Sequence, residues 1–386
     1  MVRPSRETRK KVLLVAGTRP EVIKVAPVLL ALQSDDRFEP RIVVTGQHRE
    51  MLDDSLAAFN IQPDHDLGIF QHGHSLTEVL ARAVTGLADV LGREAPDMVM
   101  VQGDTTSTLA GAIAAFHHRV AVGHIEAGLR TGNADSPYPE EVNRRLVSQV
   151  ARIHFAPTVS AGDNLVLEGV PRDAIHITGN TAVDALRLVL EAPSPTLNPA
   201  LTDLIDDHRR LVLITTHRRE SWGRALEAIA DAVATCADDH DDCLFAFTVH
   251  GNPALRTAIA SRMAKRENIV LLEPVGYASF ARLMSRSDLI ITDSGGIQEE
   301  APSLGLFVLV VRETTERPEA VAAGFARVVG TATNEIVDAF NEWKAGRNRP
   351  SSTSNPFGDG KSAVRIVAAM AHFFGLGPPP RDFVAS

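Results

Sequence analysis

A glycine turn near residue 295 is the stretch of this sequence that best suits a phosphate group. Ser294, Gly295 and Gly296 follow the apolar run Leu289–Ile291, and a helix is expected to start at Ile297. A turn without side chains lets a ligand approach the backbone, and the free N–H groups and dipole of a first helical turn attract an anion. The pattern predicts an anion-binding turn, although an ordinary strand–turn–helix connection would have the same sequence.

Charged residues near that turn, and others near the N-terminus, could hold the rest of a nucleotide. Glu300 follows in the expected helix, where a carboxylate suits ribose hydroxyls, and Arg317 follows the next strand, where a guanidinium suits a diphosphate. Arg19 and Lys24 come after another apolar run, residues 11–15. Both cations can point toward one site, but solvated surface cations would show the same spacing.

Three carboxylates also come directly after predicted strands or at the start of a helix. Asp104 follows one strand, Glu126 follows the next, and Glu140 opens a helix. Each has a structural alternative that the sequence leaves open. Asp104 could be a helix N-cap. Glu126 could pair with Arg130 on the surface. Glu140 could form a routine i,i+4 pair with Arg144.

Two histidines lie at strand ends in the second half of the chain. His217 is followed by Arg218 and Arg219, and such a cluster favours an anion. His250 follows another apolar run, and a lone histidine is more often structural than catalytic. Several polar clusters, each at the end of a different strand, are harder to explain by structural roles alone.

Apolar runs alternate with helical patterns along the whole chain, and this alternation must position the polar clusters. It predicts parallel sheets with helices on both faces, in which ligands bind at the carboxyl ends of the strands. A proline-rich break at residues 192–199 separates two series of runs and is expected to be a linker. We therefore predict an α/β fold with two Rossmann-like doubly wound domains. The runs expected as strands are Lys11–Val15, Arg41–Thr45, Met98–Gln102, Val120–His124, Ile153–Ala156, Ile175–Thr178, Leu211–Thr215, Leu244–Thr248, Ile269–Leu272, Leu289–Ile291 and Phe307–Val311.

Length, composition and charge narrow the class of protein. The chain has 386 residues, which is too long for one ordinary core, and its 44% hydrophobic and 23% charged residues are typical of a globular protein. A net charge of -9 argues against a nucleic-acid binder. Cys236 and Cys243 match neither a redox nor a zinc pattern, and no apolar segment approaches the ~18 residues that cross a bilayer. We expect a cytoplasmic protein with reduced thiols and no contact with a membrane.

A set of motifs spread over the chain resembles the non-hydrolysing UDP-N-acetylglucosamine 2-epimerases. The motifs run nearly end to end, in family order and near family spacing. They are GTRPEVIK at 17–24, TGQHREML at 45–52, QGDTTST at 102–108, GHIEAGLRTG at 123–132, PEEVNR at 139–144, HRRESWG at 217–223, SGGIQEEAPSLG at 294–305, TTERPEA at 314–320 and NPFGDGKSAVRI at 355–366.

The resemblance implies two Rossmann-like domains of the glycosyltransferase-B type, with the active site in the cleft between them. The expected domains are residues 1–190, joined by a C-terminal crossover helix at about 366–386, and residues 191–365. Members of the family interconvert UDP-GlcNAc and UDP-ManNAc. They eliminate UDP across carbons 1 and 2, hold a 2-acetamidoglucal, and add UDP back to the other face. The resemblance implies a homodimer that binds a UDP-sugar, with no nicotinamide cofactor and no metal.

The same resemblance gives roles to individual residues. The hydrogen on carbon 2 is weakly acidic and needs positioned bases, while the departing UDP needs cations and N–H donors. Arg144, one turn after Glu140, is expected to hold that carboxylate ionised and oriented. The positions that match catalytic residues are Asp104, Glu126, Glu140 and His217. The positions that match substrate-binding residues are Arg19, Lys24, Arg144, His250, Phe280, Ser294, Gly295, Gly296, Glu300 and Arg317.

The sequence departs from the family where UDP-GlcNAc activates some bacterial members. Gln47 and His48 match the residues used there, but Glu50 stands where a glutamine is usual, and Gly73 lies in a segment that lacks the expected arginine. A carboxylate at this place would repel a second diphosphate. The departure predicts turnover without allosteric activation.

Rival functions share parts of this pattern. A retaining glycosyltransferase would hold a UDP-sugar, but it needs an acceptor groove and gives the three carboxylates no purpose. A hydrolysing epimerase that releases ManNAc and UDP shares the elimination step, but its relatives open differently from GTRPEVIK. A nucleotide-sugar sensor has no need of the catalytic matches. An epimerase that acts on a modified UDP-sugar is an alternative within the same class.

Overall fold

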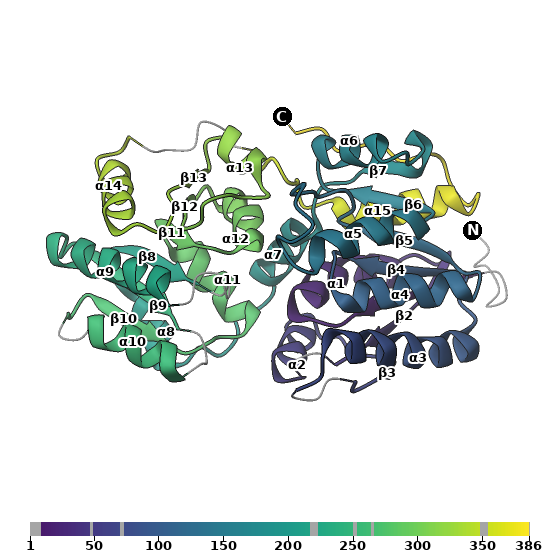
Figure 1. Cartoon of the computed structure of the whole chain (residues 1–386), viewed down its shortest axis with the longest axis horizontal. Coiled ribbons are helices and arrows are strands. Elements are labelled where there is room, and N and C mark those ends of the chain that lie inside the picture. Colours follow the sequence, from purple (N-terminus) through teal and green to yellow (C-terminus); the bar gives the residue numbers. More distant parts are fainter. Residues whose placement is uncertain are drawn as a thin grey trace. The chain divides into compact units, whose positions relative to one another are not determined.

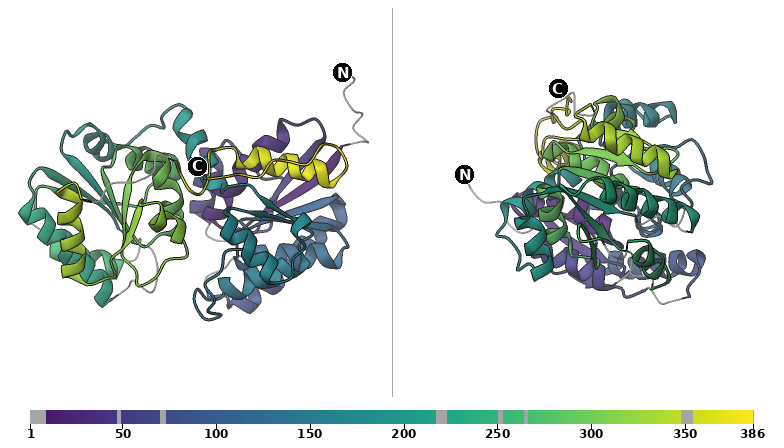
Figure 2. Two further views of the ribbon diagram at one scale, coloured as in Figure 1. Left: turned by 90° about the horizontal axis from the view of Figure 1, so that it is seen from above. Right: turned by 90° about the vertical axis from the view of Figure 1, so that its left-hand side faces the viewer.

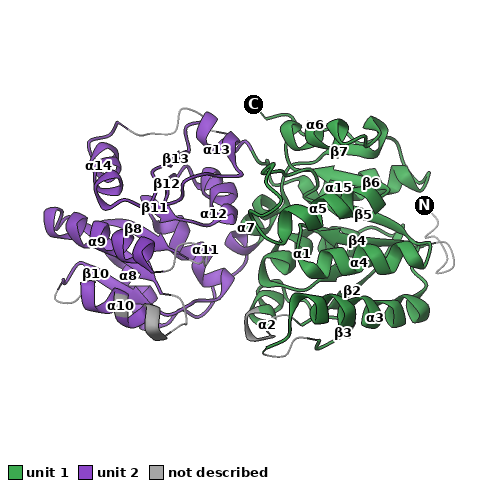
Figure 3. Ribbon diagram, viewed as in Figure 1, with its two compact units in different colours: residues 1–188, 357–385 green, residues 189–356, 386 purple. Residues whose placement is uncertain are grey.

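Two parallel sheets, each covered by helices, organise the chain (Figure 1). The computed structural model describes residues 9–46, 49–69, 73–216, 223–249, 253–263, 266–347 and 354–385. The chain divides into two compact units: unit 1 comprises residues 1–188 and 357–385, and unit 2 comprises residues 189–356 (Figure 3). The predicted α/β class with two doubly wound domains is confirmed.

Unit 1 is built on a seven-stranded parallel sheet. Its strands are β1 (Lys10–Ala16), β2 (Phe38–Val44), β3 (His65–Asp66), β4 (Met98–Gln102), β5 (Ala121–Ile125), β6 (Ile153–Ala156) and β7 (Ile175–Ile177). Their order in space is β3-β2-β1-β4-β5-β6-β7, so the order reverses between β1 and β4. Strand β1 is buried on both faces because Val12–Val15 are all apolar and at most 1% exposed. Ligands of doubly wound sheets bind at such a reversal, beyond the carboxyl ends of the strands.

Helices cover both faces of this sheet. They are α1 (Arg19–Gln33), α2 (Arg49–Ala58), α3 (Leu76–Glu94), α4 (Thr106–His117), α5 (Glu140–Val150), α6 (Val159–Leu167) and α7 (Thr181–Glu191). Helix α3 shows why such segments are helical: Val79, Ala83, Leu87 and Val90 recur every three or four residues and are buried, so one stripe faces the sheet. Its neighbour α4 packs between α3 and α5 and is buried from Ser107 to Ala115 except at Ile113, which is half-buried.

A last helix, α15 (Ser362–Phe373), belongs to unit 1 although it follows all of unit 2 in the chain. It packs against α1, as the yellow helix in Figure 2 shows. The backbone N–H of Ala363 donates to Asp184 Oδ1 at 2.8 Å, and the N–H of Asn180 donates to the carbonyl of Phe357 at 2.6 Å. These bonds fix the returning segment on α7, while the chain passes from one unit to the other between residues 356 and 357.

Unit 2 has a six-stranded parallel sheet of the same design. Its strands are β8 (Arg210–Thr215), β9 (Cys243–Thr248), β10 (Ile269–Leu272), β11 (Leu289–Thr292), β12 (Phe307–Val310) and β13 (Ala326–Val328). The order in space is β10-β9-β8-β11-β12-β13, so the reversal lies between β8 and β11. The helices are α8 (Pro199–Asp206), α9 (Arg224–Asp239), α10 (Pro253–Met263), α11 (Tyr277–Arg286), α12 (Gly295–Glu300), α13 (Pro318–Ala322) and α14 (Thr333–Lys344).

Every run predicted as a strand is a strand, with ends that shift by three residues or fewer. Strands β3 and β13 were not predicted, and α12 begins at Gly295 rather than at the predicted Ile297. Between α7 and α8, residues 192–198 form neither helix nor strand. In the part of the chain that the structure describes, no helix combines the length and apolar character needed to span a membrane.

Candidate active site

A buried glutamate fixes the loop that follows β1. Glu21 Oε2 accepts from the backbone N–H groups of Gly17 and Thr18 at 3.1 and 2.7 Å. Its Oε1 accepts from the hydroxyls of Thr105 and Thr108 at 2.7 and 3.0 Å. Burial raises the pKa of Glu21, while the hydrogen bonds, led by that from Thr105, act to lower it. This carboxyl therefore joins the loop after β1 to the loop after β4.

The same loop brings two predicted cations to the reversal of the sheet. Arg19 is the first residue of α1 and is half-buried, and Lys24 is a buried residue of the same helix. At Gly17 a Cβ atom would lie 2.0 Å from Ser107 Oγ, so the loop can approach α4 this closely only with glycine. The sequence placed both cations at a strand end, and the structure agrees.

Lys24 contacts the second predicted carboxylate. Its Nζ lies 2.5 Å from Glu126 Oε1, and the two side chains are only 11% and 7% exposed. The side-chain amides of Gln102 and Asn180 also donate to Glu126. Its backbone has φ 63°, a left-handed conformation that is uncommon for residues other than glycine. A constrained carboxylate among donors is typical of a functional site, because the surrounding structure must hold it there.

The surface pair considered for Glu126 does not form. Arg130 instead binds Glu168, with Nη2 to Oε2 at 2.6 Å, and this guanidinium lowers the pKa of Glu168. Two residues before Glu126, the imidazole Nε2 of His124 bonds the carbonyl of Gly103 at 2.7 Å. Because a carbonyl only accepts, Nε2 carries the hydrogen. Burial, before all other causes, lowers the pKa of His124 to about 3, so this ring is neutral at pH 7.

Asp104 and Glu126 lie in the loops after two neighbouring strands, because β4 and β5 are paired up to Gln102 and Ile125. Asp104 is not a helix N-cap: Thr105 caps α4, with its hydroxyl accepting from the N–H of Thr108. Asp104 Oδ2 binds Arg144 Nη2 at 2.5 Å. The loop after β4 thus holds its carboxylate toward α5.

The predicted pair between Glu140 and Arg144 is wrong. Both residues are described, and the guanidinium of Arg144 binds Asp104 and Glu141, the latter with Nη1 to Oε2 at 3.3 Å. Glu140 is half-buried at the first position of α5. An i,i+4 spacing places two residues on one face of a helix, but it does not show which groups from other elements reach that face.

In unit 2 the glycine turn lies at the reversal of the sheet, after β11. Ser294 precedes α12 and is half-buried, and Gly295 and Gly296 form the first residues of this helix. Glu300, the last residue of α12, is 6% exposed, and its Oε1 accepts from the hydroxyl of Tyr277 at 3.0 Å. Burial, and then the charge of Glu300, raise the pKa of Tyr277 well above its ordinary value.

Phe280 and Arg317 complete the predicted residues of unit 2 that the structure describes. Phe280 is half-buried, one turn after Tyr277 on α11. Arg317 is 9% exposed, and its Nε binds Glu299 Oε1 at 2.5 Å. The sequence assigned no role to Glu299, although it precedes Glu300 directly. This buried pair ties the segment before α13 to α12.

Several predictions fall on residues that the structure does not describe. His217 and His250 lie outside the described residues, as do Gln47 and His48. The side chain of Glu50 is not described either. The predictions for these residues therefore stay predictions.

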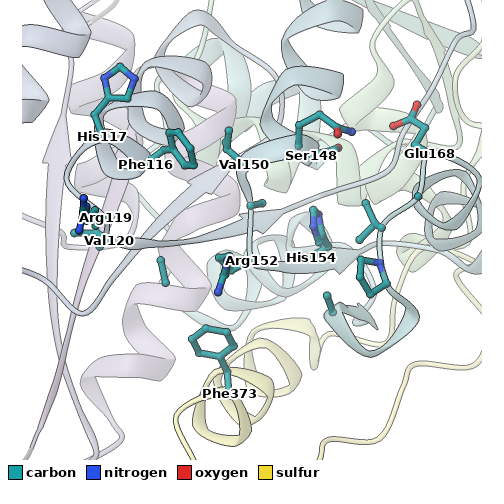
Figure 4. A pocket seen from close by; sticks show the side chains of 17 residues that line it. Phe116, His117, Arg119, Val120, Ser148, Val150, Arg152, His154, Glu168 and Phe373 are labelled. Atoms are coloured by element: carbon teal, nitrogen blue, oxygen red, sulfur yellow. The ribbon is translucent and has the colours of Figure 1, made fainter.

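A cavity of about 920 Å³ lies elsewhere in unit 1, near the amino-terminal ends of β5 and β6 (Figure 4). Its lining includes Phe116, Arg152, His154, Glu168 and Phe373, and it includes no predicted site residue. The cavity is therefore separate from the polar strand ends. Among the described residues, no group of three or more His, Cys, Asp or Glu side chains is placed to hold a metal ion.

The two doubly wound sheets, each with charged residues at its reversal point, define a two-domain α/β protein of the glycosyltransferase-B type. The sequence profile of the UDP-N-acetylglucosamine 2-epimerases matches residues 30–371. The chain belongs to the UDP-N-acetylglucosamine 2-epimerase family.

Individual relatives agree with this assignment over nearly the full length. The chain is 48% identical over 368 residues to the UDP-N-acetylglucosamine 2-epimerase of Escherichia coli K12, which covers 93% of this chain and 98% of the relative. It superimposes on S. aureus MnaA with UDP at a TM-score of 0.89 and 40% identity, over 97% of this chain and 100% of the other. The UDP-GlcNAc 2-epimerase of Neisseria meningitidis, bound to UDP-GlcNAc, gives a TM-score of 0.86 and 42% identity over 94% and 100% of the two chains.

Proposed function

We propose that this protein is a non-hydrolysing epimerase that interconverts UDP-GlcNAc and UDP-ManNAc. The observation that carries the proposal is the 48% identity to an Escherichia coli enzyme of that name over 93% of the chain. The strand ends of unit 1 add the groups that the reaction requires, since carboxylates and cations meet there in Lys24–Glu126 and Asp104–Arg144. The N. meningitidis relative, whose structure contains UDP-GlcNAc, supports the choice of sugar nucleotide.

The proposed reaction passes through elimination and re-addition of UDP. A base removes the proton from carbon 2, the C1–O bond breaks, and UDP leaves with the electron pair, giving 2-acetamidoglucal. UDP oxygen then bonds to carbon 1 again while an acid delivers a proton to the opposite face of carbon 2. Positioned side chains can perform both proton transfers. Asp104, Glu126 and Glu140 are the proposed acids and bases, with His217 acting near the diphosphate.

The cations of unit 1 have two tasks in the proposed reaction. Lys24 at 2.5 Å from Glu126 favours the ionised form of that carboxylate, which is the form that accepts a proton. Arg144 contacts the Asp104 carboxylate at 2.5 Å and is proposed to orient it. Arg19, half-buried at the start of α1, is proposed to bind substrate phosphate oxygens.

UDP is proposed to bind at the glycine turn of unit 2. The N–H groups near Ser294, Gly295 and Gly296 are suited to phosphate oxygens, and Glu300 to the ribose hydroxyls. The bond from Tyr277 at 3.0 Å orients the Glu300 carboxylate. Phe280, Arg317 and His250 are proposed as further substrate contacts. Arg317 is paired with Glu299, and we propose that it supports phosphate binding by holding the segment before α13 against α12.

Incubation with UDP-GlcNAc, followed by proton and phosphorus NMR, tests the function. We expect UDP-ManNAc to accumulate to an equilibrium, and the same mixture to form from UDP-ManNAc. In D₂O the product should carry deuterium at carbon 2. Free ManNAc with stoichiometric UDP would instead identify a hydrolysing epimerase, and an unchanged substrate would refute the proposal. A panel of modified UDP-sugars in the same assay then defines the preferred substrate.

We further propose that the protein is a cytoplasmic homodimer. Cys236 and Cys243 are both buried and form no disulfide, which suits a reducing compartment. The homodimer is proposed from the family resemblance. Light scattering of the purified protein should give twice the chain mass, whereas a single chain mass would refute the dimer.

A further inference from the structure

Glu141 is a fully buried carboxylate beside the proposed active site, and no role was assigned to it. It follows Glu140 in the first turn of α5 and has a side chain that is 0% exposed. Its two oxygens accept from the backbone N–H groups of Thr131 and Gly132 at 3.1 and 3.3 Å. They also bind Arg145, with Nη2 to Oε1 at 2.9 Å. Glu141 therefore fixes the loop after β5 against α5.

The remaining contact of Glu141, with Arg144, connects it to the proposed catalytic residue Asp104. Arg144 Nη1 lies 3.3 Å from Glu141 Oε2, and its Nη2 lies 2.5 Å from Asp104 Oδ2. One guanidinium thus connects the two carboxylates, and its side chain is only 7% exposed. The planar fork of arginine can hold two acceptors in a fixed geometry, which lysine cannot. Asn143 on the same helix adds a bond to the backbone of Asp104, from Nδ2 to the carbonyl oxygen at 2.9 Å.

We propose that Glu141 is a positioning residue for proton chemistry at Asp104 and that it acts through Arg144. The proposal rests on the function proposed above. The four groups of the described residues that bond the Glu141 side chain are all donors, so a carboxylate satisfies them and an amide does not. Without the negative charge of Glu141, Arg144 would be a nearly buried cation with Asp104 as its one carboxylate partner among the described residues. Such a buried cation costs stability unless its side chain moves. Glu141 thus keeps Arg144, and hence Asp104, in place.

The variant Glu141→Gln tests this role. It keeps the size of the side chain but presents an NH₂ group to N–H donors, so the guanidinium of Arg144 should shift. A misplacement of about 1 Å at a reacting group can cost ~100-fold in rate. We expect kcat to fall roughly 10- to 100-fold while KM changes less than about threefold, because Asp104 acts in the chemical step. Wild-type kcat in this variant would overturn the proposal.

A double-variant cycle separates positioning from a general structural role. In the Asp104→Asn background, the carboxylate that Glu141 positions is already absent, so adding Glu141→Gln should lower kcat by less than about threefold. A general loss of folded structure would multiply with the Asp104→Asn effect. The full loss in both backgrounds would therefore contradict the proposal.

Two further variants serve as a control and as a substitute for Glu141→Gln. Glu168→Gln removes the carboxylate from another ion pair of unit 1, Arg130–Glu168, which does not include Asp104. This variant should keep kcat within about threefold of the wild-type value. If Glu141→Gln does not fold, Arg144→Lys takes its place, because one ammonium group cannot hold both carboxylates. It should show the same loss of kcat and the same dependence on Asp104, and wild-type kcat would overturn the proposal.

Crystal structures of the ligand-free wild type and Glu141→Gln decide the question without an assay. The contact from Arg144 to Asp104 should be lost or lengthened in the variant. If it is retained at its wild-type distance, the inference is refuted even if the epimerase function is established. If the wild type lacks epimerase activity, the proposed function fails, but these structures still test the positioning role.

Discussion

At the residue scale, the charged groups of unit 1 are linked in specific pairs at the carboxyl ends of β1, β4 and β5. The sequence could indicate Asp104, Glu126 and Lys24, because each follows a predicted strand and parallel strands end at one edge. It could not indicate the partner of Arg144, because helix spacing suggested Glu140 while the structure shows Asp104 and Glu141. Such partners depend on how separate elements pack, and local sequence does not contain that information.

The carboxylates give the first prediction. Replacing Asp104, Glu126 or Glu140 with its amide should lower kcat by about 10²–10⁴, the range expected when a general acid or base is lost. Turnover of UDP-GlcNAc by NMR is the measurement. Asp173→Asn, the same kind of change at an exposed residue, is the control and should retain wild-type turnover. Wild-type rates in all three amide variants would show that these carboxylates are not the acids and bases.

Two buried histidines of β5 and β6 give a prediction about pH. Burial lowers the pKa of His124 to about 3 and that of His154 to about 4, with the charge of Arg130 acting in the same direction on both. The unfolded chain takes up protons on these rings near pH 6.5, but the folded chain does not. Stability is therefore complete above pH 6.5 and decreases as the pH falls toward 4. At pH 5.5 each ring should cost about 1.4 kcal/mol.

Urea unfolding at pH 7.5 and pH 5.5 measures this cost. In a variant with His124→Gln and His154→Gln, the loss of unfolding free energy between the two pH values should be smaller by about 2.7 kcal/mol than in the wild type. The comparison uses the pH-dependent difference, so a uniform change in stability does not affect it. An equal pH-dependent loss in the two proteins would show that these rings are not the source.

At the element scale, the order and type of the long elements could be predicted because buried parallel strands are unbroken apolar runs. Strand β3 consists of two polar residues, His65 and Asp66, and β13 has Arg327 at its centre, so neither forms such a run. The start of α12 was misplaced because Gly295 and Gly296 indicate a turn, yet both occupy the helix. Glycine permits many backbone conformations, so its presence alone does not select one.

Gly305, which ends the turn after α12, gives a prediction at this scale. It has φ 69° and ψ 18°, a left-handed conformation, and nothing lies within 4 Å of an added Cβ. Gly305→Ala should therefore cost about 1 kcal/mol through backbone strain alone. Gly92 within α3 also has open space, and Gly92→Ala should stabilise the protein by about 0.5–1 kcal/mol. The two variants should change the unfolding free energy in opposite directions relative to the wild type. Equal changes in the two variants would exclude the backbone explanation.

At the scale of the whole molecule, each unit repeats one design: a doubly wound sheet whose strand order reverses at the point where the site residues gather. In unit 1 the reversal carries carboxylates and cations, and in unit 2 it carries the glycine turn with Glu300. The alternation of runs was sufficient to predict two such sheets. The division of the chain between residues 356 and 357 was not apparent locally, because the long return of α15 to α1 is a tertiary contact.

The different residues at the two reversal points predict which segments of the chain UDP protects from hydrogen exchange. If UDP binds at the glycine turn, hydrogen exchange should slow in unit 2 at residues 292–300 and around Arg317. A ligand at 100 times its Kd stabilises the state that it binds by about 2.7 kcal/mol, which corresponds to ~100-fold slower exchange for amides that exchange only after unit 2 opens. Mass spectrometry of exchange with and without UDP measures this protection segment by segment.

A matched pair of variants makes the experiment specific for the ribose contact. Glu300→Gln removes the carboxylate that is proposed to bind the ribose hydroxyls. It should raise the Kd for UDP about tenfold, which corresponds to ~1.4 kcal/mol of binding free energy. Glu342→Gln makes the same change in the same unit at a half-exposed side chain that pairs with Arg327, and it should leave UDP binding unchanged. Protection by UDP that is confined to unit 1, or that responds equally to both variants, would remove the glycine turn and Glu300 from the UDP site.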